Sequence, residues 1–334
     1  MSKVIFIVPY FGKFPNYFQL VLNSMEVNKK FNWLIFTDNN ENYKFPENVK
    51  AIKITFNEIK EEIQKKFDFE IFLEKPYKLC DFRPAYGYIF EEYLKEYTHW
   101  GYSDIDIIFG NLSKFITEDI LSKYEKIFTM GHMTLYKNTY ENNRRFMEEY
   151  KGKKLYKKYL SSNKNFAFDE LYEKGEGRYS INNIYEKLEI EVYNKKTIAD
   201  VYVLEQNFRL VKDFDREDIG DIFEEQRESI FTYEKGKILR YYFKFNEFIK
   251  REYMYIHLQK RKMTYNGNIK NFKIVPNSFI ELNSEITCKN FFYEKKRLLD
   301  KNYIKHLIKI KEIKLKNNLR KYKILKKIYN LLKS

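Results

Sequence analysis

Apolar residues follow two different periods over the first part of the chain. Short runs rich in β-branched and aromatic residues predict strands, whereas longer runs with apolar residues at helical spacing predict helices. The strand-like runs are residues 3–9, 33–37 and 49–56, and the helical runs are residues 16–29 and 57–66. This alternation predicts an α/β fold with a mostly parallel, Rossmann-like sheet flanked by helices. Further along, the pattern predicts a helix over residues 118–123, a strand over 126–130 that continues through 131–136, and helices over 142–160. Residues 230–243 predict a hairpin that turns at 234–237.

Turn-forming and polar residues follow the predicted strands. A parallel sheet binds ligands at the carboxyl ends of its strands, and the residues that come next in the chain there are Pro9, Tyr10, Phe11 and Asp38. We expect these residues to lie at a ligand-binding edge. Asp38 has two interpretations, either a turn former or a hydrogen-bond partner of a nucleotide base or ribose.

Asp104 and Asp106 stand one residue apart, directly before the apolar run Ile107–Phe109. Alternation along a strand places both carboxylates on the same side of the chain. Two carboxylates held together at a strand end are costly unless a cation neutralises them. Carboxylate oxygens are ligands that Mg²⁺ and Mn²⁺ prefer, so the pair predicts a divalent metal site. Charged surface turns also produce this spacing.

A block dense in charged and aromatic residues, 75–87, precedes the Asp104/Asp106 pair. We expect a helix over residues 84–97, because proline is favoured in a first helical turn. Lys78, Asp81 and Arg83 would then stand near a helix N-terminus, where anions bind. A cluster of salt bridges explains these three residues equally well.

Two later segments carry candidate chemistry. Asp169 and Glu170 form an acidic pair that opens a predicted helix, and a capping role is the alternative interpretation. His257 lies on a predicted strand and is followed by Lys260 and Lys262. An imidazole that completes a metal site, beside cations that neutralise a pyrophosphate, is a consistent combination.

Taken together, these motifs resemble a glycosyltransferase of the GT-A fold. The resemblance covers residues 1–280 and is carried by the N-terminal strand–helix–strand, by the blocks 75–84 and 103–106, and by His257 with Lys260. The stretch 75–111 is similar to a bacterial family of glycosyltransferases from capsule and lipopolysaccharide gene clusters.

The resemblance implies a metal-dependent hexosyltransferase. In GT-A enzymes an Asp-x-Asp pair and a late histidine hold Mn²⁺ or Mg²⁺ against the diphosphate of a nucleotide sugar. That implies metal ligation by Asp104, Asp106 and His257, with Lys260 and Lys262 near the phosphates. The expected donor is a nucleotide-diphosphate sugar, UDP-hexose foremost, and the expected acceptor is a glycan or a lipid-linked molecule in bacterial surface polysaccharide synthesis.

The expected reaction also divides the chain into functional parts. An inverting mechanism needs a base for the acceptor hydroxyl, and we expect Asp169 in that role, with Glu170 second; a retaining mechanism needs no such base. The domain implied by the resemblance is residues 1–299, with a nucleotide-sugar half over 1–112 and an acceptor half over 113–299.

Composition limits the partners and the compartment. The chain has 334 residues, 44% of them hydrophobic, and a formal net charge of +15. Lysine supplies 50 of the 62 basic residues, a bias typical of AT-rich genomes, so the charge alone does not predict a nucleic-acid partner. Cys80 and Cys288 lack metal-type spacing and indicate a reducing cytoplasm. Neither a signal peptide nor a membrane span is predicted.

Two other functional classes stay open. A non-enzymatic RNA-binding protein would use the basic charge and the many aromatic residues for stacking, but it leaves Asp104, Asp106 and His257 unexplained. A metal-dependent nucleotidyltransferase or nuclease would also use paired carboxylates, although more acidic ligands would be expected.

The last 35 residues, 300–334, concentrate the charge. They hold 12 basic and 2 acidic residues, a net charge of +10. Apolar residues recur there at helical spacing, namely Leu315, Leu319, Tyr322, Leu325, Tyr329 and Leu332. The pattern predicts a basic amphipathic helix that binds an anionic membrane surface, at the inner face of the membrane. The alternative is a helix that packs on its own domain.

Overall fold

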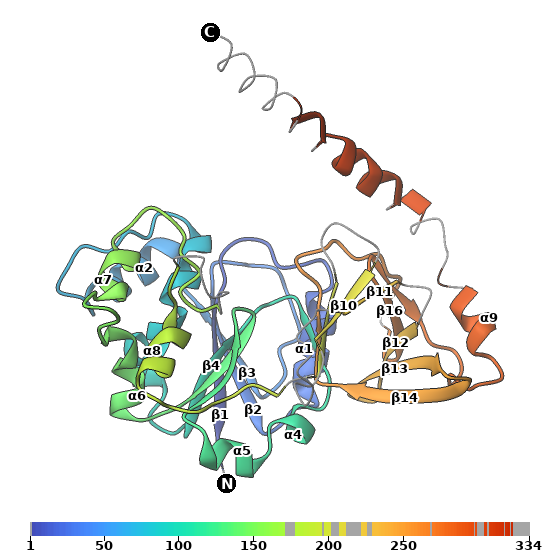
Figure 1. Cartoon of the computed structure of the whole chain (residues 1–334), viewed down its shortest axis with the longest axis horizontal. Coiled ribbons are helices and arrows are strands. Elements are labelled where there is room, and N and C mark those ends of the chain that lie inside the picture. Colours follow the sequence, from blue (N-terminus) through green and yellow to red (C-terminus); the bar gives the residue numbers. More distant parts are fainter. Residues whose placement is uncertain are drawn as a thin grey trace. The chain divides into compact units, whose positions relative to one another are not determined.

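The structure is a computed structural model that forms two compact units (Figure 1). It describes residues 2–170, 178–195, 197–201, 207–211, 222–225, 229–267, 269–296, 298, 304–305, 307–316, 318–320 and 322. Within this part, unit 1 covers the chain up to Thr197, and unit 2 covers Ile198–Val211 and the residues from 220 onward.

Unit 1 is built on a seven-stranded sheet with the order β3-β2-β1-β4-β7-β6-β8. Its strands are β1 (Val4–Pro9), β2 (Phe31–Thr37), β3 (Val49–Lys53), β4 (His99–Ser103), β6 (Lys126–Met130), β7 (Met133–Lys137) and β8 (Val192–Tyr193). Strands β3, β2, β1 and β4 are parallel, whereas β7 is antiparallel to both β4 and β6. The predicted α/β fold with a parallel-rich sheet is therefore confirmed.

Helices cover the sheet of unit 1. They are α1 (Phe18–Glu26), α2 (Phe56–Gln64), α3 (Tyr86–Ile89), α4 (Leu112–Phe115), α5 (Glu118–Lys123), α6 (Tyr140–Arg144), α7 (Leu155–Leu160) and α8 (Ile181–Lys187). Helix α2 begins where the sequence predicts a boundary, because Thr55 and Glu58 form a capping box that satisfies the first N–H groups.

Alternation along the strands divides the apolar core between the two faces of the sheet. Ile5 and Ile7 of β1 pack in one cluster with residues of α2, α7 and α8. Phe6 faces the other side, where its ring stacks on Trp33 at 5.4 Å. Helix α1 holds the short strand β5 (Ile107–Phe109), because Ser24 Oγ accepts a hydrogen bond from the Phe109 N–H at 3.1 Å.

The helix expected over residues 84–97 is wrong. The chain instead forms a 3₁₀ helix over Pro76–Ala85, the single turn α3 and a second short 3₁₀ helix over Glu91–Tyr93. Three residues per turn place side chains at i and i+3 directly above one another. This geometry lets Lys78 Nζ reach Asp81 Oδ2 at 2.7 Å, a pairing within one turn of the 3₁₀ helix.

Two further expectations are corrected in unit 1. Residues 131–136 do not continue strand β6 but return as the antiparallel strand β7. The helical region expected over 142–160 is interrupted, because a short 3₁₀ turn (Arg145–Met147) and a bridge between Tyr150 and Lys153 separate α6 from α7. The helix expected after Glu170 falls mainly on residues 171–174, which lie outside the described residues.

Unit 2 is rich in antiparallel strands. One sheet has the order β14-β13-β12-β16-β17, and the strands β11-β10-β9-β15 follow one another in a second. The strands are β9 (Ile198–Val201), β10 (Asn207–Val211), β11 (Ile222–Glu225), β12 (Ser229–Glu234), β13 (Lys237–Lys244), β14 (Glu247–Tyr253), β15 (Tyr255–His257), β16 (Phe272–Val275) and β17 (Ser278–Glu281). The hairpin expected at residues 234–237 is confirmed, since Lys235 and Gly236 both have positive φ.

Each unit buries a lysine side chain. In unit 1, Lys126 is 0% exposed and donates to the Phe128 carbonyl and to Asn182 Oδ1. In unit 2, Lys273 is 2% exposed and pairs with Glu294 of helix α9 (Phe291–Lys296) at 2.7 Å. Acceptors meet both ammonium groups, as buried cations require.

The basic C-terminal segment is described in part. Residues 304–305, 307–316, 318–320 and 322 are helical, and the predicted apolar positions Leu325, Tyr329 and Leu332 lie outside the described residues. Among the described helices none has the length and apolarity to cross a membrane.

A glycine determines how closely β4 and β7 approach. A Cβ atom on Gly101 would meet the Thr134 backbone oxygen and lie 2.6 Å from Leu135 Cδ2. We expect Gly101→Ala to lower the free energy of unfolding by about 1–3 kcal/mol, because the two strands must separate. Urea denaturation measures the change, with exposed Lys50→Ala as a control expected to stay within about 0.5 kcal/mol. Unchanged stability of Gly101→Ala would contradict this account of the sheet.

Candidate functional site

Three parallel strands end at one edge of the unit 1 sheet. The register pairs Val8 of β1 with Ile35 of β2, and Ile7 of β1 with Tyr102 of β4. The residues that follow these strands therefore share the carboxyl edge, as the sequence predicts. They are Tyr10 and Phe11 after β1, Asp38 after β2 and Asp104 after β4.

The loop after β1 is fastened by Asp38. The exposed Asp38 side chain accepts a hydrogen bond from the Gly12 N–H at 2.7 Å, and Gly12 has a φ of 98° that favours glycine. Phe11 packs its ring edge-on against Phe56 at 5.3 Å. Of the two interpretations of Asp38, the structure supports loop formation directly, and nucleotide binding stays a prediction.

The expected alternation along one strand is wrong, because Asp104 and Asp106 lie in the turn between β4 and β5. Carboxylate oxygens of the two residues nevertheless come within 4.8 Å of each other. The Asp104 N–H donates to the His132 carbonyl at 2.8 Å, which fixes the turn against the β6–β7 connection. Asp106 is fully buried. Burial, followed by the charges of Asp106 and then Asp104, raises the pKa of the nearby Tyr10. The predicted pair is thus a concentrated negative site.

Arg83 balances that negative charge. Its guanidinium donates to Asp104 Oδ1, to the Gly131 carbonyl and, at 2.8 Å, to Asp169 Oδ2. The guanidinium carbon also lies 5.1 Å from the ring centre of Tyr102. Arg83 therefore binds both Asp104, which is predicted as a metal ligand, and Asp169, which is predicted as a catalytic base.

Lys78 and Asp81 form a closed internal pair. Lys78 is 4% exposed and donates to Asp81 as well as to the carbonyls of Tyr159 and Lys164. Asp81 also accepts from the N–H groups of Phe166 and Phe168. All three ammonium hydrogens of Lys78 have protein acceptors, so the salt-bridge interpretation describes this pair and Arg83 better than the anion-binding one.

Asp169 is a buried acid and Glu170 an exposed one. Desolvation by burial raises the pKa of Asp169 from 3.8 to about 7, although the charge of Arg83 opposes the shift. Its Oδ1 atom is buried and accepts no hydrogen bond from the described residues. The Glu170 side chain passes close to Gly131, where a Cβ atom would lie 2.6 Å from Glu170 Oε1. Of the two predicted bases, only Glu170 has an exposed position.

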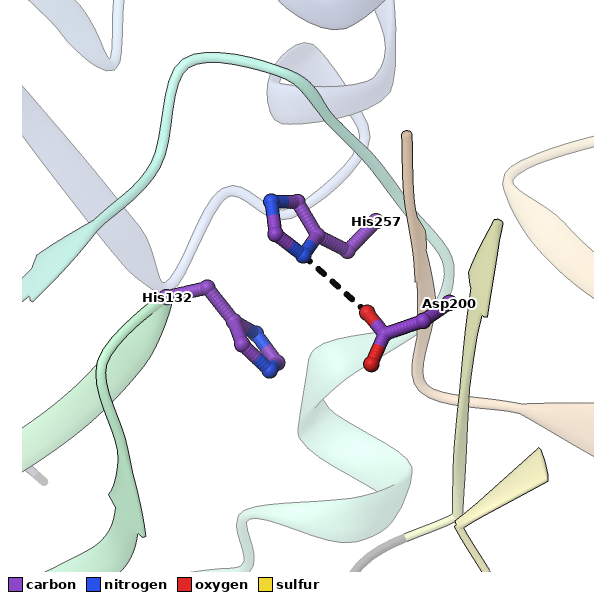
Figure 2. Close-up of side chains that lie close together, drawn as sticks. All are labelled: His132, Asp200 and His257. Carbon is purple, nitrogen blue, oxygen red and sulfur yellow. Dashed lines mark hydrogen bonds and ion pairs between the residues drawn. The ribbon is translucent and has the colours of Figure 1, made fainter. Parts of the chain in front are cut away.

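In unit 2, His257 ends β15 and pairs with Asp200 on the adjacent strand β9. His257 Nδ1 lies 3.0 Å from Asp200 Oδ1, and both residues are buried. Figure 2 shows the imidazole turned toward the Asp200 carboxylate, with this contact drawn as a dashed line. An ionised carboxylate only accepts, so the proton belongs on Nδ1 and the Nε2 lone pair becomes the metal-binding one. The side-chain amide nitrogen of Gln259 lies 3.2 Å from the same Nδ1 atom.

The cations after His257 differ in exposure. Lys260 and Lys262 are exposed, whereas Arg261 between them is buried, and burial lowers its pKa to about 10. Gln259 and Lys260 both have positive φ, which ends the strand and turns the chain here. The two predicted phosphate ligands are therefore accessible.

The sequence did not identify Asp200 or His132. Asp200 interrupts an apolar strand-like run, and a charged residue buried in a strand needs a partner. This interruption is the sequence feature that could have identified Asp200. His132, also labelled in Figure 2, belongs to the turn between β6 and β7 in unit 1. No local pattern distinguishes it from an ordinary turn residue.

A protein-family model described as a family of unknown function, DUF6625, matches residues 6–283. The chain belongs to the DUF6625 family. No curated protein matches it. The DUF6625 match contains every candidate site residue and ends before the basic C-terminal segment.

The raised pKa of Asp169 predicts a pH-dependent stability. An acid whose pKa is higher in the folded state than in the unfolded state stabilises the fold fully when the pH lies below its unfolded-state pKa. This contribution to stability is lost as the pH rises through the folded-state pKa. We therefore expect the difference in unfolding free energy between wild type and Asp169→Asn to fall between about pH 4 and pH 7, by up to about 1.4 kcal/mol per unit.

Chemical denaturation at a series of pH values measures this difference. The exposed Asp68→Asn variant is the matched control, since Asp68 is 78% exposed. A difference that does not change with pH would show that Asp169 is ionised throughout, as a strong pairing with Arg83 would require.

The contact between Asp200 and His257 predicts a specific imidazole tautomer. We expect neutral His257 to carry its proton on Nδ1 in the wild type and in Asp200→Asn, because an asparagine oxygen still accepts that proton. Asp200→Ala should lose this preference. Nitrogen chemical shifts of the imidazole in metal-free protein report the tautomer, and an Nε2-protonated ring in the wild type would contradict the assignment.

Proposed function

We propose that this protein is a metal-dependent glycosyltransferase of the GT-A type, transferring a hexose from a nucleotide-diphosphate sugar. The observation that carries the proposal is the pair Asp104 and Asp106, held within 4.8 Å at the carboxyl edge of a parallel-rich sheet. Ligands of α/β sheets bind at that edge. Paired carboxylates there are suited to a cation that bridges protein and diphosphate.

The donor groups fit a divalent metal. Asp104 and Asp106 of unit 1 offer hard carboxylate oxygens. The resemblance to GT-A enzymes adds His257 of unit 2, whose contact with Asp200 favours the tautomer with a free Nε2 lone pair. Carboxylates suit Mg²⁺ and Mn²⁺, and imidazole favours the transition metal, so we propose Mn²⁺ ahead of Mg²⁺. When bound, such a cation would stabilise the negative charge of the departing nucleoside diphosphate.

The protein side chains have separate roles in this proposal. Exposed Lys260 and Lys262 would bind the phosphates, and the loop of Pro9, Tyr10 and Phe11 would contact the nucleoside, as would Asp38. Arg83 orients the Asp104 carboxylate by hydrogen bonding to its Oδ1 atom. Lys78 and Asp81 keep a structural role in the proposal, because they satisfy each other and the backbone around them.

The acceptor hydroxyl needs a proton acceptor if the mechanism inverts configuration. We propose Glu170 for this step, since it is exposed, and assign Asp169 to holding Arg83. The acceptor would be a glycan or a lipid-linked molecule of bacterial surface polysaccharide synthesis. A lipid-linked acceptor would place the enzyme at the cytoplasmic face of the membrane.

The first functional prediction concerns Asp104 and Asp106. We expect Asp104→Asn or Asp106→Asn to lower the Mn²⁺-dependent turnover of a UDP-hexose on the order of 1000-fold, because charge neutralisation of the diphosphate is worth several kcal/mol. Release of UDP by the purified full chain measures this. The exposed Asp68→Asn variant, with the same change in charge, should keep full activity.

Turnover that survives chelation and both substitutions would contradict the proposed function. If the protein cleaves a phosphodiester but leaves sugar nucleotides intact, this result would instead favour the nuclease or nucleotidyltransferase class.

The second functional prediction concerns His257. We expect His257→Ala to weaken Mn²⁺-dependent binding of UDP by about 10–100-fold, because a ligand to the metal is lost, while metal-free UDP binding stays unchanged. Calorimetric titration with and without Mn²⁺ separates the two. Equal UDP affinity of wild type and variant in the presence of Mn²⁺ would make His257 a structural residue.

A further inference from the structure

The C-terminal helix presents apolar side chains to solvent. Among the described residues of the C-terminal segment, 304–322, five large apolar side chains are between 53% and 66% exposed. They are Ile304, Ile308, Leu315, Leu319 and Tyr322. Their spacings of 4, 7, 4 and 3 residues place them along one face of an α-helix. We call these five residues the tail face.

The same helix has another, covered face. Ile310 is only 7% exposed, and Leu307 and Ile313 are half-buried. The helix is thus apolar on two sides, of which one is covered and one faces solvent. A helix that packs on its own domain and has no other contact would carry polar residues on its outer side. The exposed apolar tail face therefore indicates a binding partner.

The charges around the tail face identify the chemistry of that partner. The described residues of 304–322 include six basic side chains and a single acidic one, Glu312. The basic residues are Lys305, Lys309, Lys311, Lys314, Lys316 and Arg320. Long basic side chains beside an apolar stripe can reach outward to phosphate while their stems lie along apolar surface.

We propose that the tail face binds an anionic lipid surface, lying in the membrane interface rather than crossing it. The apolar side chains would enter the acyl boundary and the lysines would contact lipid phosphates. This inference goes beyond the proposed function and holds for any reaction at the site, because its evidence lies outside the residues that the DUF6625 model matches.

Charge and apolarity together favour lipid over two other occupants. A nucleic acid would use the lysines but would leave the apolar stripe in water. A second copy of the helix would cover the stripe but would bring two strongly basic surfaces together. An anionic bilayer satisfies both features of the tail face at once.

The test compares three triple variants of the full chain in vesicle co-sedimentation. The charge variant is Lys305→Gln, Lys309→Gln and Lys316→Gln. The apolar variant is Ile308→Ser, Leu315→Ser and Leu319→Ser. The matched control, Lys29→Gln, Lys44→Gln and Lys50→Gln, removes three exposed charges from unit 1. All the substituted positions are exposed, so the variants should fold, which circular dichroism checks.

We expect wild type and control to bind vesicles that contain phosphatidylglycerol, and to bind pure phosphatidylcholine weakly. The charge variant should bind the anionic vesicles about 100-fold more weakly, because each lysine near the membrane surface contributes roughly 1 kcal/mol of binding free energy. The apolar variant should lose at least about tenfold, and added salt should release the wild type.

Three outcomes would overturn the proposal. An apolar variant that binds anionic vesicles as well as the wild type would reduce the contact to simple charge attraction. A control that loses as much as the charge variant would show that the tail face is not special. Absence of vesicle binding by the wild type, together with RNA binding or a dimer that the tail variants abolish, would assign the surface to one of the other occupants.

Discussion

Arg83 is the cation around which the carboxyl edge of unit 1 is assembled. Its guanidinium holds Asp104 after β4, Asp169 in the loop before α8 and the carbonyl of Gly131 between β6 and β7. Two carboxylates this close would repel each other where little water screens their charges. The shared guanidinium offsets this repulsion and gives each carboxylate a hydrogen-bond partner. The orientation of Asp104 therefore depends on Arg83, which belongs to the 3₁₀ helix Pro76–Ala85 and not to a strand of the sheet.

The sequence indicates those parts of the fold that depend on local signals. The strands near Val4, Phe31 and Lys126 stand out as apolar runs, and α5 follows from a threonine cap with acids in the first turn. The edge shared by Asp38 and Asp104 also follows from the sequence, because it needs only the direction of the strands. These predictions succeed because each is decided within about ten residues of chain.

The remaining features depend on contacts across long separations. Arg83 meets Asp169 across 86 positions, and His257 meets Asp200 across 57, so no pattern in either segment names its partner. The 3₁₀ geometry of Pro76–Ala85 likewise fits the burial of Lys78 and Asp81 against a distant loop rather than helical propensity. Candidate residue types could therefore be predicted, whereas their pairing and their division into structural and accessible roles could not.

The buried lysines have a practical consequence. An amine that is enclosed and already bonded to oxygen cannot react with acylating reagents in solution until its surroundings open, whereas surface amines react at once. Lys126 in unit 1 and Lys273 in unit 2 are both in this protected state. Each unit thus contains its own natural reporter of local opening, and mass spectrometry of time-resolved acylation would reveal whether the two units loosen together or one after the other.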